Sequence, residues 1–271
     1  MALFKFNFKS KKNNNETYAL ADSATDESMI GDKLNFASTE AYKLLRTNLM
    51  FSFPDEHGCK VIGVTSAMRG EGKSLTAINT AYSLAAANKK VLLIDADLRL
   101  PSVSKKSGLR MSPGLSNLLV STNKMADTLQ HYAFKSTSVS FDVIASGDIP
   151  PNPSELLGSE RMSILIRELT QYFEYIILDL PPIIDVSDAL VVSRIVSGII
   201  IVVRQNYTQR HLLSEAIKQL EFVNAKILGF VFNGATETTT AYGKTYGKYG
   251  RYYKKKYSSY YAKGEAEEGG E

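Results

Sequence analysis

The residues between positions 65 and 74 have the types and the spacing of a phosphate-binding loop. A short β-branched run is followed by the pattern A-x-x-x-x-G-K-S, whose key members are Gly70, Gly72, Lys73 and Ser74, and a helical stretch begins there. Phosphate oxygens need a concave set of backbone N–H groups, a helix N-terminus and a cation, and this pattern supplies all three. The serine hydroxyl would contact Mg²⁺. The pattern therefore predicts a nucleotide site rather than a glycine-rich turn with a chance lysine.

Three aspartates stand at the ends of two other predicted strands. Asp95 and Asp97 close one apolar run, and Asp179 closes a later one, just before two prolines. In an open α/β sheet the ligand lies beyond the carboxyl ends of the strands, so we expect these carboxylates beside the phosphate loop. Asp179 would hold Mg²⁺, which leaves at least one carboxylate for use as a general base. Taken alone, each aspartate could also be a helix cap or a turn residue.

The elements that position these residues alternate along the chain. Near-continuous apolar strands separated by helices predict a mostly parallel sheet covered on both faces, and right-handed crossovers then give a doubly wound α/β domain of P-loop NTPase type. Strands are expected at 60–65, 91–95, 140–144, 175–180, 198–203 and 227–233. Helices are expected at 73–88, 160–172, 187–195 and 209–223, after a first capped helix that starts near Ser38 and ends before Pro54.

The domain is expected at residues 36–235, between a flexible leader at 1–35 and a flexible tail at 236–271. Residues 9–33 show no apolar period, and order is expected to begin near Phe36. The net charge of the 271 residues is +4, but the two ends together carry +7 and residues 16–240 carry −3. A nucleic-acid-binding domain usually has its basic surface on the folded body, so this distribution argues against nucleic acid as a partner.

Eight of the 15 tyrosines fall in the last 30 residues. They stand among Gly, Lys and Ser without aliphatic residues to bury them, which is typical of an exposed segment. A basic, aromatic segment could also contact nucleic acid or anionic lipid. The eight are Tyr242, Tyr246, Tyr249, Tyr252, Tyr253, Tyr257, Tyr260 and Tyr261.

Cysteine and histidine usage indicates neither a disulfide scaffold nor a zinc site. The single Cys59 rules out an internal disulfide, and the three histidines are dispersed without metal-ligand spacing. No apolar run approaches the roughly 18 residues of a spanning helix. We therefore expect a cytoplasmic protein with no metal other than nucleotide-bound Mg²⁺.

The phosphate loop, the segment Leu92–Arg99, the strand end Asp179-Leu180-Pro181-Pro182 and the tyrosine-rich tail together resemble the bacterial tyrosine kinases (BY-kinases). The form most similar is the cytoplasmic kinase of Gram-positive capsular and exopolysaccharide systems, over about residues 36–261. Partition-type and division-site ATPases carry a second lysine early in the loop, where this chain has Met68. The resemblance implies ATP- and Mg²⁺-dependent autophosphorylation of the tail tyrosines, mainly in trans, and regulation of polysaccharide synthesis and export.

Carried onto this chain, the resemblance assigns roles to individual residues. Lys73 would bind the β- and γ-phosphates, while Ser74, Asp97 and Asp179 would organise Mg²⁺. Asp95 is predicted to accept the phenol proton, since a tyrosine with a pKa of about 10 is protonated at neutral pH; Asp97 is the alternative base. The predicted nucleotide contacts are Arg69, Gly70, Glu71, Gly72, Lys73, Ser74 and Asn233.

Three further features allow two interpretations each. Arg99 could stabilise developing charge or form a surface salt bridge. Asn233, at the end of the last strand, could contact the base or cap a turn. Glu40, Lys43 and Arg46 follow the spacing of a Glu-x-x-Arg-x-x-Arg pattern that builds a ring-shaped oligomer in the family, although a solvated helix face with an intrahelical pair explains them too.

The resemblance also implies partners and a location. The partners are further copies of the chain, a membrane adaptor with an activating cytoplasmic tail, a cognate tyrosine phosphatase and protein substrates of polysaccharide synthesis. The location is the cytoplasm, with recruitment to the inner face of the cell membrane through the adaptor. The alternative function is a P-loop ATPase switch whose basic, tyrosine-rich tail only binds a partner or a membrane.

Overall fold

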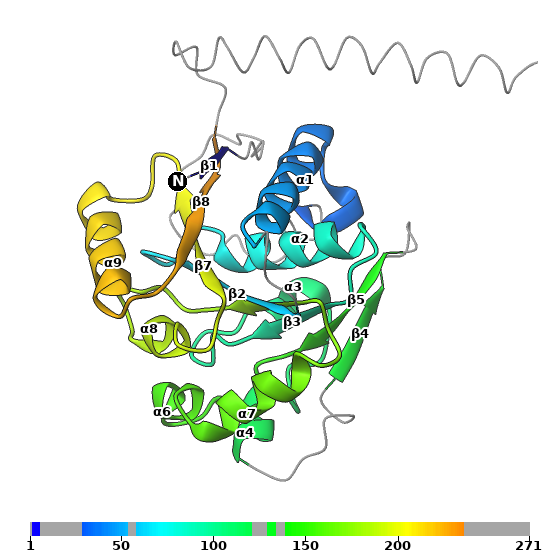
Figure 1. The fold of residues 1–271 in the computed structure, drawn as a ribbon, viewed down its shortest axis with the longest axis vertical. Coiled ribbons are helices and arrows are strands. Elements are labelled where there is room, and N and C mark those ends of the chain that lie inside the picture. Colours follow the sequence, from blue (N-terminus) through cyan, green and yellow to red (C-terminus); the bar gives the residue numbers. More distant parts are fainter. Residues whose placement is uncertain (1, 6–28, 54–57, 121–128, 134–138, 236–271) are drawn as a thin grey trace, which may run out of the picture. The chain divides into compact units, whose positions relative to one another are not determined.

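The described strands form one sheet in which neighbours are parallel except at one edge (Figure 1). The computed structural model describes residues 2–5, 29–53, 58–120, 129–133 and 139–235, all within the unit Met1–Ala235. The strand order is β1-β8-β7-β2-β6-β3-β5-β4, and only β4 runs antiparallel to its neighbour. The predicted doubly wound, mostly parallel α/β fold is confirmed, and all six predicted strands are present.

The strands are β1 (Ala2–Lys5), β2 (Lys60–Ser66), β3 (Val91–Asp95), β4 (Leu129–Ala133), β5 (Ser140–Ile144), β6 (Tyr175–Asp179), β7 (Gly198–Arg204) and β8 (Ile227–Asn233). The helices are η2 (Gly31–Lys33), α1 (Phe36–Phe51), α2 (Lys73–Ala85), α3 (Val103–Ser107), α4 (Leu115–Val120), α6 (Pro153–Leu157), α7 (Glu160–Leu169), α8 (Asp188–Val192) and α9 (Arg210–Phe222).

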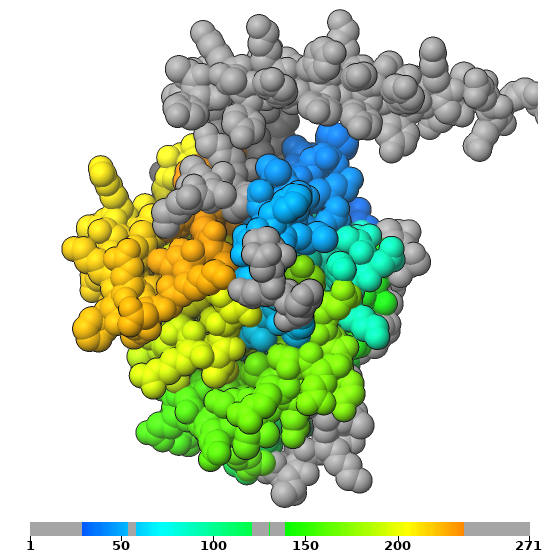
Figure 2. All heavy atoms as spheres, viewed as in Figure 1, coloured from blue at the N-terminus to red at the C-terminus, as the bar shows by residue number. Residues whose placement is uncertain are grey.

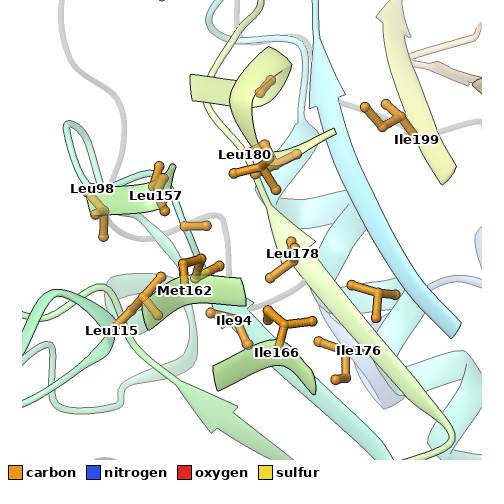
Figure 3. Packing of buried hydrophobic residues seen from close by; sticks show 14 of the residues in the cluster. Ile94, Leu98, Leu115, Leu157, Met162, Ile166, Ile176, Leu178, Leu180 and Ile199 are labelled. Atoms are coloured by element: carbon orange, nitrogen blue, oxygen red, sulfur yellow. The ribbon is translucent and has the colours of Figure 1, made fainter. Parts of the chain in front are cut away.

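Helices cover both faces of the sheet because the central strands are apolar on both sides. Alternate residues of each strand enter opposite clusters: Leu92 and Ile94 of β3 join one, while Val91 and Leu93 join the other. The first cluster is closed by α4 and α6–α9, as Figure 3 shows for Met162 packing near the strands, and the second by α1–α3. The resulting frame fixes the carboxyl ends of β2, β3 and β6 side by side.

The ordered domain begins earlier than the predicted boundary near Phe36. The buried side chain of Asn79 in α2 holds the segment before α1, because its amide donates to the Met29 carbonyl at 2.9 Å and its Oδ1 accepts from the Gly31 amide at 2.8 Å. Ile30 is only 3% exposed. A buried amide needs partners, and a single apolar residue gives no period in the sequence, so the pattern did not indicate this contact.

The sheet also has two edge strands that the sequence did not predict. β1 lies within the predicted leader and pairs with β8 in parallel, from Ala2 opposite Gly229 to Lys5 opposite Phe232. β4 pairs with β5. An open edge offers unpaired backbone groups to any short segment nearby, so strands of four or five residues form there without a marked hydrophobic period.

Residues 236–271 lie outside the described part of the chain, and so do most of the predicted leader, at 6–28, and the segment that contains Pro54. Among the helices that are described, none has the length and apolar character needed to cross a membrane.

Candidate active site

The phosphate loop connects β2 to α2, as predicted. β2 ends at Ser66, and α2 begins at Lys73 with Gly72 as its N-cap. Gly72 has a φ of 92°, a left-handed conformation that favours glycine, and a Cβ there would lie 2.1 Å from Nδ2 of Asn233. The loop therefore requires glycine at this position both for its backbone angle and for the close approach of the β8 end.

The loop is held from behind by one side chain at the end of β7, Arg204, and by one that follows this strand, Thr208. Glu71 is buried, and its carboxylate accepts from the Met68 amide at 2.8 Å and from the Thr208 hydroxyl in a short bond. Arg204 donates to the Gly70 carbonyl at 2.8 Å. Burial raises the pKa of Glu71, whereas the Met68 amide and the Thr208 hydroxyl lower it by less.

These contacts refine the predicted set of nucleotide contacts. The side chain of Glu71 faces the protein interior and braces the loop, so its backbone, not its carboxylate, is available to phosphate. The bracing residues Arg204 and Thr208 were missed from the sequence because they stand 134 and 137 residues from their partners in the loop and belong to no motif. Arg69 projects outward and pairs with Asp185 at 2.8 Å.

Lys73 lies among the predicted carboxylates. Its ammonium is 2.7 Å from Oδ2 of Asp97, 3.7 Å from Oδ1 of Asp179 and 3.4 Å from the hydroxyl of Ser74. Burial alone would lower the pKa of Lys73, but the charges of Asp179 and Asp97 outweigh it, so the pKa is raised and the lysine stays charged. The fold thus brings the predicted cation and two predicted carboxylates into one cluster.

Asp179 is the least satisfied member of the cluster. Its side chain is fully buried, and among the described residues neither carboxylate oxygen accepts a hydrogen bond of normal geometry, although the Ser74 hydroxyl and the Lys73 ammonium lie near. Burial is the largest influence and raises its pKa, while Lys73 opposes that rise. Buried polar atoms in native proteins are normally paired, so these two oxygens indicate a ligand that the chain itself does not provide.

A magnesium ion fits this donor set. Mg²⁺ usually binds through one or two carboxylates together with substrate phosphates and waters. The hydroxyl of Ser74 and the carboxylates of Asp97 and Asp179 offer hard oxygen donors beside the phosphate loop. No group of three His, Cys, Asp or Glu side chains suited to a metal occurs in the part of the chain that the structure describes, and the nucleotide phosphates would complete the coordination.

Asp95 lies deeper than Asp97 and is tied to the backbone. One oxygen accepts from the Asp97 amide at 3.2 Å, and the other from the amides of Ser102 and Val103 at 3.2 and 3.0 Å. Burial, followed by the charge of Asp179, raises the pKa of Asp95, and the Val103 amide partly offsets this. Asp95 therefore shapes the loop after β3, while Asp97 directs one oxygen to Lys73.

Arg99 is engaged by Asp188. The guanidinium donates to both carboxylate oxygens, at 2.9 and 3.1 Å. Of the two interpretations of Arg99, the structure supports an ion pair, but Asp188 is fully buried, so the pair is not an ordinary surface contact.

Asn233 ends β8 at the phosphate loop. Its Nδ2 donates to the Glu71 carbonyl at 3.0 Å, and its Oδ1 is buried without a hydrogen-bond partner among the described residues. Asn233 therefore braces the loop and keeps one acceptor available.

The three predicted oligomerisation residues all lie on α1, which Figure 2 shows in blue at the surface of the described part. Lys43 pairs with Glu40 at 2.8 Å within the helix, and Arg46 donates to the Ser83 carbonyl of α2 at 2.8 Å. Phe36, Leu44 and Phe51 of the same helix are at least half exposed. Within one chain the charged residues thus have partners, and the apolar ones do not. The eight tail tyrosines lie outside the described residues.

Comparisons with known proteins extend these observations. A family model described as an AAA domain matches residues 59–228. Tyrosine-protein kinase YwqD of Bacillus subtilis (strain 168) is 38% identical over 197 residues, which cover 73% of this chain and 81% of that protein. Tyrosine-protein kinase CpsD of Streptococcus agalactiae is 34% identical over 215 residues, covering 78% of this chain and 90% of that protein.

A solved structure agrees with the sequence comparisons. The kinase domain of the Escherichia coli tyrosine kinase ETK superposes with a TM-score of 0.75 at 29% identity, covering 88% of this chain and 92% of that one. The shared region contains the phosphate loop and all the strands that carry the aspartates.

Proposed function

The chain belongs to the bacterial tyrosine kinase family and is a protein-tyrosine kinase, and from that premise we propose that it phosphorylates its own C-terminal tyrosine cluster. The observation that carries the proposal is the buried cluster of Lys73, Asp97 and Asp179 at the phosphate loop, in which both oxygens of Asp179 lack a hydrogen-bond partner among the described residues. ATP and Mg²⁺ are the proposed cofactors, since the cluster offers a cation for phosphate and oxygens for a divalent metal.

Each residue of the cluster has a proposed task. Lys73 would bind the β- and γ-phosphates and stabilise the charge of the transferring group. Ser74, Asp97 and Asp179 would hold Mg²⁺, which would neutralise phosphate charge. Phosphoryl transfer needs little covalent help from a protein, so positioning and electrostatics supply most of the rate. We propose Asp95 as the base that accepts the tyrosine proton, with Asp97 as the alternative.

The two candidate bases can be separated. In Asp95→Asn the backbone hydrogen bonds to the carboxylate survive only in part, so its effect on stability must be measured beside activity. A variant that folds normally, binds ATP normally and loses turnover supports Asp95. If Asp95→Asn instead loses metal affinity, and Asp97→Asn loses turnover while its ATP and metal affinities stay normal, the base is Asp97.

The proposed role of Asn233 is to accept a hydrogen bond from the adenine amino group. Its buried Oδ1 lacks a partner among the described residues and lies next to the phosphate loop. GTP has a carbonyl where ATP has this amino group, so Asn233→Ala, which removes the acceptor, should reduce the preference for ATP over GTP. Equal preference in the wild-type protein would contradict this role.

The tail is the proposed substrate, reached mainly in trans within a homo-oligomer. β8 ends at the phosphate loop, and residues 241–263 carry seven Lys or Arg and no acid, against the negative net charge of residues 16–240. From Asn233 to Tyr246 an extended chain spans about 40 Å, enough to reach a neighbouring subunit. The exposed apolar side chains of α1 support assembly through that helix, with Glu40, Lys43 and Arg46 as the proposed ring contacts.

The proposed setting is the inner face of the cell membrane, where an adaptor recruits and activates the kinase during capsular or exopolysaccharide synthesis and export. Proposed further partners are a cognate tyrosine phosphatase and protein substrates of polysaccharide synthesis. Nucleic acid is not a proposed partner, since residues 16–240 carry a net charge of −3.

The test is intact-mass analysis after incubation with Mg-ATP, with the cytoplasmic segment of a membrane adaptor also supplied. We expect increments of one phosphate, confined to the tail on digestion and absent from Lys73→Met. Mixing active chains that lack residues 236–271 with inactive full-length Lys73→Met chains separates trans from cis transfer. ATP hydrolysis without any increment would instead support the alternative, an ATPase switch whose tail binds a partner or a membrane.

A further inference from the structure

A closed set of hydrogen bonds beside the nucleotide cluster joins Arg99, Ser154 and Asp188. Nε and Nη2 of Arg99 donate to the two oxygens of Asp188 at 2.9 and 3.1 Å, and Nη2 also donates to the Ser154 hydroxyl at 3.0 Å. The Ser154 hydroxyl in turn donates to Asp188 in a short bond. The Asp188 side chain is fully buried, while that of Arg99 is 36% exposed.

This network connects the two strand ends that carry the carboxylates. Arg99 stands two residues after Asp97 in the loop that follows β3, and Asp188 begins α8, which follows β6 and Asp179. Within the first loop, Oδ1 of Asp97 accepts from the Leu100 amide at 3.0 Å, so Asp97 and Arg99 move together. The sheet holds the backbone up to this point, because the Ala96 amide donates to the Asp179 carbonyl at 2.9 Å. Beyond Ala96 the loop that carries the Asp97 side chain is held relative to Asp179 through the contact between Arg99 and Asp188.

The network also determines what Arg99 can do. Two of its nitrogens are directed to Asp188, whose buried charge would be left unpaired if the arginine turned toward a phosphate. Leaving a buried charge unpaired is costly, so the guanidinium is held away from the reacting groups. The hydrogen bonds to the Asp188 carboxylate raise the pKa of Arg99, which keeps the guanidinium charged.

We propose that Arg99 is a positioning residue that acts through Asp188, by holding the Asp97 loop at the separation from Asp179 that the nucleotide and its cation require. The proposal rests on the assignment of the nucleotide site made above. It differs from a direct role of Arg99 on the phosphoryl group, in which Asp188 would be dispensable.

The experiment is a double-variant cycle on the full-length protein with Arg99→Gln, Asp188→Asn and both together. A small displacement of a reacting group costs up to about 100-fold in rate, so we expect each single variant to lose about 10- to 100-fold in kcat with the KM for ATP changed less than about 3-fold. The double variant should be no slower than the slower single one. Arg99→Lys, which keeps the charge but not the two-pronged contact, should lie between.

A second readout needs neither nucleotide nor metal. The amide of Leu100 reports on the loop through its bond to Asp97, so its hydrogen exchange in the free protein should be faster in Arg99→Gln and Asp188→Asn. Glu174→Gln is the matched control, because Glu174 joins the same two strands at their other end. Its Leu100 exchange and kcat should equal those of the wild type.

Four outcomes would overturn the proposal, and a fifth would overturn the proposed function on which it rests. Normal kcat in Asp188→Asn with loss in Arg99→Gln would mean that Arg99 acts on the phosphates itself. Losses that multiply in the double variant, or an unchanged Leu100 exchange, would also overturn it. If a single variant does not fold, the double variant is measured in its place, because it leaves no unpaired buried charge. A wild-type kcat in the double variant would refute the positioning role of Arg99. If the wild-type protein forms no phosphotyrosine, the proposed function fails, and the same pattern is then sought in ATP hydrolysis.

Discussion

The neighbouring strands β3 and β6 are bridged by charged side chains at both ends, and the two ends differ in how those charges are satisfied. At the amino end, Lys89 pairs with Glu174 at 2.8 Å, and the other oxygen of Glu174 accepts from the Lys90 amide at 2.9 Å. The side chain of Lys89 is 30% exposed and that of Glu174 is 45% exposed. At the carboxyl end, Lys73 pairs with Asp97 at 2.7 Å, and both side chains are almost fully buried.

The pKa values show what this difference means. The Lys89 ammonium lowers the pKa of Glu174, so its charge is favoured in the folded state. Burial raises the pKa of Asp179, so its charge is disfavoured there. The same two strands therefore carry a charge that stabilises the fold at one end and a charge that costs stability at the other. Such a cost is expected where a ligand completes the site.

The largest expected effect comes from Asp179→Asn. Removing the carboxylate takes a donor from the proposed metal site, so tyrosine phosphorylation should fall by at least about 100-fold. It also removes a buried charge, so the free energy of unfolding should rise by about 1–2 kcal/mol at neutral pH. Phosphate incorporation and chemical denaturation measure the two effects.

The pH dependence provides the control for Asp179→Asn. A carboxylate whose folded-state pKa is raised costs nothing below its unfolded pKa of about 3.9 and reduces stability as the pH rises from there through the folded value. The advantage of the variant should therefore disappear toward pH 4. A variant that is less stable than the wild type at neutral pH would mean that Asp179 is satisfied in the free protein, and the contrast between the two ends would fail.

The residues at the carboxyl ends of the strands were easier to predict from the sequence than the rest, because a polar residue directly after an apolar run marks a strand end. Asp95, Asp97 and Asp179 each follow an uninterrupted apolar run, and parallel strands place such residues on one edge. Lys73 was predicted for the same reason, from the glycine pattern before a helix. To predict that these residues lie together, it is enough to know that the strands form one parallel sheet.

The residues that brace the site were not predictable in this way. Thr208 and Asp188 have no motif, and each finds its partner, Glu71 or Arg99, only after the chain has folded. The clamp of Asn79 on the segment before α1 is similar, since one buried amide leaves no period in the sequence. The short edge strands were not predicted for a related reason: they form through backbone pairing, which leaves no side-chain pattern in the sequence.

A smaller effect is expected from Thr208→Val, behind the phosphate loop. The change removes the hydroxyl that donates to the buried Glu71, and a buried carboxyl that loses a donor destabilises a fold by about 1–3 kcal/mol. Because the loop holds the phosphates, the KM for ATP should rise about 3- to 10-fold, with a lesser change in kcat. Steady-state kinetics and thermal unfolding measure both.

Thr208→Ser is the matched control for this variant, since it keeps the hydroxyl and removes only a methyl group. It should restore most of the ATP affinity. If the serine variant behaves like the valine variant, the packing of the methyl group holds the loop, and not the hydrogen bond to Glu71. The Thr208 hydroxyl would then not be what satisfies the buried Glu71 carboxylate.

The smallest expected effect is that of Glu174→Gln at the amino end. Glu174 is about half exposed, so solvent screening limits the contribution of its pair with Lys89 to about 1 kcal/mol or less, and kinase activity should not change. Its lowered pKa fixes the sign of the pH dependence. The stability that it adds is present above the unfolded pKa of about 4.3 and is lost as the pH falls through the folded value, so wild type and variant should converge below about pH 4. Asp179→Asn converges with the wild type in the same range but from the opposite side, because there the variant is the more stable protein. Denaturation of both variants from pH 3 to 7 thus measures the contrast directly, and curves with the same sign would refute it.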